Sequence, residues 1–265
     1  MEALLEKTRT LNKLIQKAAG NPVDFPAIAQ VLSENIEVNI YLVGRRGKIL
    51  GYNFLEGFTC DIMTDIILHS ECFPESYNQE LLLITETKAN ISQQANTCFF
   101  HSSEKCPLND KKMTIIPIFG GGERLGSLIL TKIGSDVGPA ELVLAEHGAT
   151  VVGMEIMRIK TERVEADTRK KAAVQIALGT LSFSEMEAAE HIFFELGSSE
   201  GLLVASRIAD RVGITRSVIV NALRKLESAG VIEAKSLGMK GTYIRVLNEN
   251  LLEELKRIRW NKKIR

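Results

Sequence analysis

The chain has 265 residues, which is enough for two domains with separate hydrophobic cores. Its 33 lysines and arginines balance its 33 aspartates and glutamates, and this neutrality argues against a general nucleic-acid binder. No window approaches the ~18–20 apolar residues of a transmembrane helix, and the N-terminus lacks a signal peptide's apolar core. We therefore expect a cytoplasmic protein whose four cysteines are reduced thiols.

The first half of the chain alternates between helical and β patterns. Helices are predicted over residues 2–19 and 25–35, and over much of 60–84 with an interruption at Phe73 and Pro74. Two β-hairpins are predicted, one from 38–43 with 49–54 and one from 113–119 with 125–132. An α/β domain of this kind has the layout of a small-molecule sensor, although its strand order cannot be read from one sequence.

The glycine-rich segment 120–127 invites an alternative interpretation as a phosphate-binding loop. Such a loop needs Lys beside Ser or Thr after its last glycine, and it needs a helix to follow. Leu128, Ile129 and Leu130 follow instead, and they indicate a strand. We predict a tight hairpin turn here and do not assign a GTP site to it.

From Pro139 onward the pattern is helical for a long way, and charged residues crowd 158–171. The predicted helix has ~35–40 residues and a length of ~55 Å. One small domain cannot bury such a helix, so it suggests a linker, a dimer seam or both. A broken pair of ordinary helices is the alternative.

Residues 205–224 meet every requirement of a helix-turn-helix. Ile208, Val212, Ile219 and Ala222 form the apolar seam between two crossing helices, and Ala209 is small where the second helix passes. Gly213 can end the first helix in the left-handed conformation. Thr215 can cap the second helix by accepting backbone N–H bonds. A plain helical hairpin is the alternative.

Two period-two segments, 231–236 and 242–246, follow around the turn 237–241 and predict the wing of a winged helix. Arginine and asparagine suit bidentate contacts with guanine and adenine edges, and wing lysines normally meet phosphate. The candidate DNA-binding residues are Ser206, Thr215, Arg216, Ser217, Asn221, Arg224, Lys225, Lys235 and Lys240.

The charge is divided unequally along the chain. Residues 200–265 contain 14 lysines and arginines and 7 aspartates and glutamates, a net charge of +7, and the other 199 residues carry −7. A basic module joined to an acidic one fits a DNA reader fused to a regulatory domain that should not itself bind DNA.

The chain resembles the CodY family of nutritional transcription repressors. The resemblance is carried by 200–232 and 236–244, and also by 116–126, 146–156, 4–9 and Phe73-Pro74. It implies an α+β chain with a GAF-type N-terminal domain, a long helical linker and a winged helix that binds operators. It further implies a homodimer, with isoleucine, valine or leucine and GTP as effectors. No resident cofactor and no enzymatic activity are expected.

The same resemblance places the ligand pocket. The implied ligand-binding positions are Met63, Ile67, Phe73, Pro74, Tyr77, Thr97, Cys98, Phe99, Phe100 and His101. The carboxylate-binding arginine of the family falls at Met63, or at Ile62 with a shift of one residue, and neither can pair with a carboxylate. Candidate replacements are His101, Lys105 or Lys88, or backbone amides near 97–102.

A metal- or redox-responsive regulator is the alternative function. His69 with Cys72, and Cys98 with His101 and Cys106, resemble soft metal ligands at loop spacing, but no CxxC pair is present. For an enzyme, no nucleophile elbow, HExxH or paired-carboxylate motif emerges. The domains predicted are a sensor over 1–155, a linker over 139–180 and a DNA-binding domain over 181–265.

Overall fold

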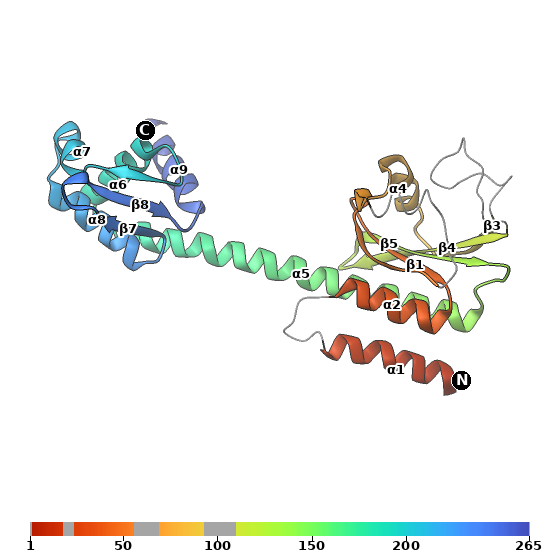
Figure 1. Cartoon of the computed structure of the whole chain (residues 1–265). Helices are drawn as coiled ribbons and strands as arrows, with labels where there is room; N and C mark the ends of the chain where they lie inside the picture. Colours follow the sequence, from red (N-terminus) through yellow and green to blue (C-terminus); the bar gives the residue numbers. More distant parts are fainter. Residues whose placement is uncertain (1, 18–23, 56–68, 93–109, 265) are drawn as a thin grey trace. The chain divides into compact units, whose positions relative to one another are not determined.

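The computed structural model describes residues 2–17, 24–55, 69–92 and 110–264. The chain divides between Lys160 and Thr161 into an N-terminal unit (residues 1–160) and a C-terminal unit (residues 161–265). Each unit has its own hydrophobic core, and both contain helices and a sheet (Figure 1). The predicted α+β class is thereby confirmed.

The N-terminal unit is built on a five-stranded antiparallel sheet of order β2-β1-β5-β4-β3. Both predicted hairpins are present. The strands are β1 (Asn39–Gly44), β2 (Ile49–Asn53), β3 (Lys88–Ser92), β4 (Lys111–Gly120) and β5 (Glu123–Ile133). Gly121 and Gly122 have φ angles of 58° and 79°, as a two-residue type I′ turn requires. A strand therefore follows the glycine-rich segment, as predicted, and no phosphate-loop helix.

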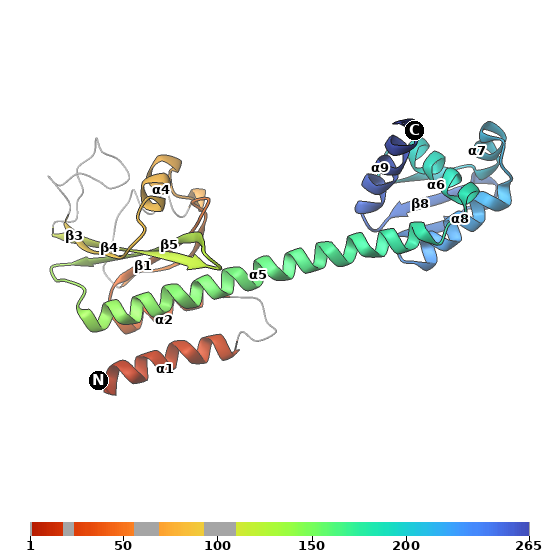
Figure 2. The same ribbon diagram turned by 180° about the vertical axis from the view of Figure 1, so that it is seen from behind.

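Helices cover the two faces of this sheet differently (Figures 1 and 2). The helices are α1 (Glu2–Lys17), α2 (Phe25–Ile36), α4 (Glu75–Leu82) and the first part of α5 (Pro139–Gly179). On one face, Leu32 of α2 and Val152 of α5 share a core with the inward residues of β1, β4 and β5. On the other face, Phe73 and Leu81 pack with Tyr41 and Ile129 in a smaller cluster.

Helix α5 is continuous over 41 residues, which corresponds to about 60 Å. The alternative of a broken pair of helices is therefore wrong. Val152 is buried in the core of the N-terminal unit and Val174 in that of the C-terminal unit, whereas residues 161–172 are all exposed. An exposed middle with buried ends is typical of a linker, and the dimer seam stays a prediction.

The C-terminal unit combines a helix-turn-helix with a three-stranded antiparallel sheet of order β6-β8-β7. The helices are α6 (Phe183–Leu196), α7 (Ala205–Val212), α8 (Arg216–Ser228) and α9 (Asn250–Ile264). The strands are β6 (Glu200–Leu203), β7 (Ile232–Ser236) and β8 (Thr242–Val246), with the short 3-10 helix η3 (Gly238–Lys240) at the wing turn. The α-helices and strands of this unit share one apolar core.

We predict that Gly153→Ala destabilises the N-terminal unit, although alanine favours a free helix by about 1 kcal/mol. A Cβ at Gly153 would lie 2.3 Å from the carbonyl oxygen of Phe119 on β4, so the helix and the sheet must separate. We expect a net loss of about 1–3 kcal/mol in the free energy of unfolding, measured by urea denaturation. Gly179→Ala in the same helix is the control, because its Cβ meets nothing within 4 Å. Equal stability of the two variants would contradict the prediction.

Candidate nucleic-acid interface and ligand site

Helices α7 and α8 meet through the predicted seam. Ile208 and Ile219 are each 1% exposed and Ala222 is fully buried, while Val212 packs against the same core. Gly213 has a φ of 75°, and its N–H donates to the carbonyl oxygen of Ala209 at 3.0 Å, which ends α7 in the left-handed conformation. The helix-turn-helix is therefore formed by the residues from which it was predicted.

Thr215 stands at the N-cap of α8 but makes no side-chain cap hydrogen bond. Its Oγ1 lies 2.8 Å from Oγ of Ser217. The predicted capping bond to the backbone is therefore wrong, because the hydroxyl is engaged with its neighbour on the exposed side of the helix. Both hydroxyls are exposed.

The exposed face of α8 carries side chains suited to base edges. Ser217, Asn221 and Arg224 follow one another at intervals of four and three residues, so they lie on one face of the helix. The other candidate DNA-binding residues, Ser206, Thr215, Arg216, Lys225, Lys235 and Lys240, are also exposed. Lys235 lies on β7 and Lys240 at the end of η3, so both belong to the wing.

Lys225 differs from the other candidate cations. Its Nζ lies 2.7 Å from Oε2 of Glu185 and 3.0 Å from the carbonyl oxygen of Thr180. Its side chain is 42% exposed, and that of Glu185 only 10%. Lys225 thus points back toward the protein, which its position in the sequence did not indicate.

An aromatic cluster covers the second face of the N-terminal sheet. Phe73 is 3% exposed, and its ring centroid lies 6.2 Å from that of Tyr41 and 5.8 Å from that of Tyr77. The hydroxyl of Tyr77 donates to Sδ of Met113 at 3.4 Å. Pro74 is the N-cap of α4, the helix that carries Tyr77. Phe73 and Tyr77, two of the implied ligand-binding residues, thus pack in one apolar cluster, and Pro74 lies between them in the sequence.

The remaining implied pocket residues, Met63, Ile67, Thr97, Cys98, Phe99, Phe100 and His101, lie outside the described residues. The same holds for Cys106 and Lys105. Cys72 is half-buried, with its Sγ 3.8 Å from the carbonyl oxygen of Arg46. Among the residues that the structure describes, no group of three or more His, Cys, Asp or Glu side chains could hold a metal ion. Lys88 is exposed on the edge strand β3.

Arg124 is a cation that the sequence analysis assigned only to a turn. Its Nη2 donates to the carbonyl oxygen of Leu81 at 3.1 Å and to Oγ of Ser127 at 2.8 Å, beneath the end of α4. Its Nε and Nη1 are buried and have no hydrogen-bond partner among the residues that the structure describes. Burial lowers the pKa of Arg124 to about 10. Buried unpaired donors on a guanidinium are costly, and an anion would satisfy them.

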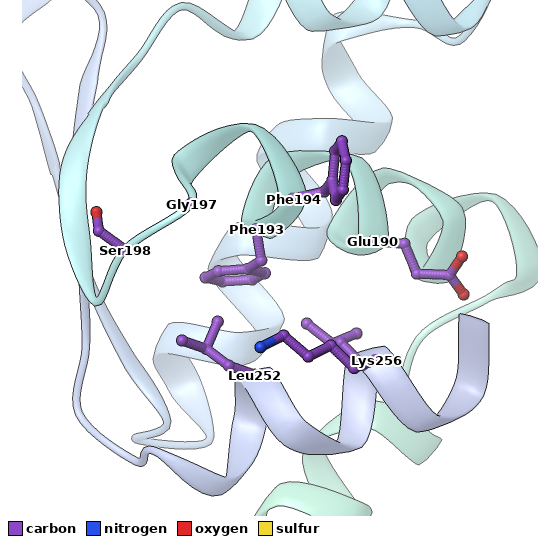
Figure 3. Close-up of a pocket in the computed structure, with 8 residues that line it drawn as sticks. Glu190, Phe193, Phe194, Gly197, Ser198, Leu252 and Lys256 are labelled. Atoms are coloured by element: carbon purple, nitrogen blue, oxygen red, sulfur yellow. The ribbon is translucent and has the colours of Figure 1, made fainter. Parts of the chain in front are cut away.

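The C-terminal unit contains a cavity of about 280 Å³ between α6 and α9. Figure 3 shows Phe193 of α6 and Leu252 of α9 facing each other across it. The lining residues are Glu190, Phe193, Phe194, Gly197, Ser198, Leu252, Leu255 and Lys256. This cavity was not predicted from the sequence, because neither of the two helices that enclose it was predicted.

Within the described part of the chain, no helix is both long and apolar enough to cross a membrane. Helix α5 has the length, but charged residues fill its middle.

Comparison with known proteins places the whole chain in one family. Residues 3–180 match the CodY GAF-like domain, and residues 199–259 match the CodY helix-turn-helix domain. The global transcriptional regulator CodY of Clostridium botulinum (strain Alaska E43) is 58% identical over 259 residues, which cover 98% of this chain and 100% of that protein. The protein of the same name from Clostridium perfringens (strain SM101) is 55% identical with the same coverage.

Among solved structures, the cofactor-binding GAF domain of the nutrient sensor CodY from Clostridium difficile is 31% identical to the matching part of this chain. The match covers 57% of this chain and 96% of that domain, with a TM-score of 0.42. The match to the CodY helix-turn-helix domain agrees with the helix-turn-helix described above. The chain belongs to the CodY family of global transcriptional regulators.

Proposed function

We propose that this chain is a DNA-binding transcriptional regulator, mainly a repressor, of genes used during nutrient limitation. The observation that carries the proposal is the exposed face of α8, where Arg216, Asn221 and Arg224 project from a fully formed winged helix. Such side chains read base edges when a recognition helix enters the major groove. Membership of the CodY family assigns the chain to transcription regulators and not to enzymes.

A homodimer is part of the proposal. Helix-turn-helix regulators that bind DNA as dimers place two recognition helices on half-sites about one helical turn apart, so one chain would read half an operator. The exposed segment 161–172 of α5 supplies a surface along which two chains could associate. An effector must bind the DNA-competent state more tightly than the other state, since otherwise it shifts no equilibrium.

The proposed effectors are isoleucine, valine or leucine, together with GTP. Phe73, Tyr77 and Tyr41 form an apolar aromatic surface suited to a branched aliphatic side chain. The carboxylate of such a ligand needs a cation, and Met63 cannot supply one. Arg124 meets this need, because its unpaired donors are buried beneath α4, the helix that also carries Tyr77.

Calorimetry of the full chain tests the ligand proposal. Isoleucine, valine and leucine should each give a binding isotherm, and Arg124→Gln should weaken the binding of isoleucine by about tenfold or more, the range of one charged hydrogen bond. Lys88→Gln is the control, because Lys88 is exposed at the sheet edge. A separate titration with GTP tests the second effector.

Three results would each overturn a part of the proposal. If no branched-chain amino acid binds, the amino-acid effector is wrong while the DNA-binding function stands. If zinc binds tightly instead, the metal-responsive alternative at Cys72, Cys98, His101 and Cys106 takes its place. If isoleucine binds equally well to wild type and Arg124→Gln, another group holds the carboxylate.

A further inference from the structure

Lys225 links the recognition helix both to the segment that joins α5 to α6 and to the first turn of α6. Its ammonium group donates to Oε2 of Glu185 at 2.7 Å and to the carbonyl oxygen of Thr180 at 3.0 Å. These partners lie 40 and 45 residues earlier in the sequence. Two of the three donors of the ammonium group are therefore directed at the protein and not at solvent or phosphate.

Glu185 is itself fixed in place. It forms a capping box with Ser182, in which the Ser182 N–H donates to Oε2 of Glu185 at 2.7 Å and the Glu185 N–H donates to Oγ of Ser182 at 3.4 Å. The residue is 8% exposed. The hydrogen bond from Lys225, followed by that from the Ser182 backbone, lowers the pKa of Glu185. A carboxylate so nearly buried requires its cationic partner, so removing Lys225 leaves an uncompensated charge.

The last turns of α5 pack in the hydrophobic core of the C-terminal unit. Val174, Ala177 and Leu178 are buried in the core that also holds Ile219 and Leu226 of α8. A second polar contact fixes α5 to the end of the wing, where Nδ2 of Asn248 donates to the carbonyl oxygen of Lys170 at 2.8 Å. The recognition helix is thus attached to the C-terminal end of α5 by packing and by hydrogen bonds on two sides.

We propose that Lys225 is a positioning residue and not a DNA contact. With Glu185 it holds α8 in a fixed orientation on the end of α5, so that a change in α5 reaches the recognition helix directly. The inference rests on the proposed function for the DNA target and for the effector. It replaces the sequence-based prediction that Lys225 binds DNA.

Two neighbouring substitutions separate positioning from phosphate contact, namely Lys225→Gln and the control Arg224→Gln. Both remove one cation from α8, and Arg224 is exposed. The affinity for operator DNA, selected by the full-length protein from a random-sequence pool, is measured by anisotropy over a range of salt concentrations. Each phosphate contact contributes about 1 to the slope of log affinity against log salt. Thermal unfolding of the C-terminal unit is followed by scanning calorimetry of the full chain.

We expect Lys225→Gln to weaken operator binding about tenfold with an unchanged salt slope. We also expect it to lower the unfolding midpoint of the C-terminal unit by about 4–8 °C. Arg224→Gln should leave the midpoint unchanged. Lys225→Arg, which keeps the positive charge, should have the operator affinity, salt slope and midpoint of the wild type. The opposite result for Lys225→Gln, a slope reduced by about 1 at an unchanged midpoint, would show a phosphate contact and overturn the inference.

Glu185→Gln completes the test, because glutamine retains the capping box but removes the charge. The double variant with Lys225→Gln should bind operator no more weakly than either single variant, because both residues act through one interaction. Additive losses would show that they act independently and would contradict the inference. In both single variants the gain in operator affinity caused by isoleucine should shrink, which loss of stability alone does not produce. If wild type shows no isoleucine response, the proposed effector is wrong, while the slopes and midpoints still decide the role of Lys225.

Discussion

Replacing Arg216 and Asn221 together by alanine is expected to reduce operator affinity by about 2–6 kcal/mol, or roughly 30- to 25,000-fold. Each bidentate contact with a base edge accounts for about 1–3 kcal/mol of discrimination. Both residues are exposed on α8, so the loss of their side chains leaves the core of the C-terminal unit intact. The midpoint of thermal unfolding of the C-terminal unit, measured by calorimetry, should therefore stay at its wild-type value.

The control for this double variant is Lys240→Ala on the wing. A phosphate contact carries no sequence information, so Lys240→Ala should weaken specific and non-specific binding alike and lower the salt slope by about 1. The Arg216/Asn221 variant should lose specific binding in preference to non-specific binding. Wild-type operator affinity in the double variant would show that α8 is not the recognition helix.

Phe73→Ala is expected to abolish the response to isoleucine. Phe73 is 3% exposed and contacts both Tyr41 and Tyr77, so its removal opens the centre of the aromatic cluster. Truncation of a buried phenylalanine typically costs about 3–5 kcal/mol of stability, so the effect on the ligand must be separated from the effect on the fold. Operator binding without isoleucine should survive, since the C-terminal unit has its own core.

Leu32→Ala is the control that separates loss of the isoleucine response from loss of stability. Leu32 is fully buried on the opposite face of the same sheet, in the cluster formed with α5. It should lose about 2–5 kcal/mol of stability and still respond to isoleucine under conditions in which it is folded. If Phe73→Ala keeps the isoleucine response, the pocket lies elsewhere. If both variants lose the response, the loss reflects reduced stability and not the pocket.

Local signals made the helix-turn-helix predictable from the sequence. The turn needs glycine at one position and small or apolar residues at fixed distances from it, and Gly213, Ala209 and Ile219 satisfy these needs within a few residues of one another. The β4–β5 hairpin was predictable for the same reason, since adjacent glycines with positive φ separate two apolar strands.

Strand β3 and helix α6 were not predicted, for different reasons. Strand β3 lacks a regular local pattern, and exposed aromatic residues obscure the apolar face of α6. Strand β3 is an edge strand without regular alternation, and its Asn90 has a φ of 53°. Helix α6 exposes Phe183 and Phe194, so its apolar pattern does not mark one face, although the capping box from Ser182 to Glu185 signalled its start. The contact between Lys225 and Glu185 joins residues 40 apart, and no local pattern predicts it.

The central claim is that a ligand controls the DNA binding of this regulator. The most direct test is to measure the affinity of the full-length protein for its selected operator with and without isoleucine. Allosteric coupling free energies are typically 1–3 kcal/mol, so saturating isoleucine should raise operator affinity about 5- to 150-fold while leaving non-specific binding unchanged. Phe73→Ala should show the affinity of the unliganded protein under both conditions. Equal operator affinity of wild type with and without isoleucine, when calorimetry shows that isoleucine is bound, would contradict the account.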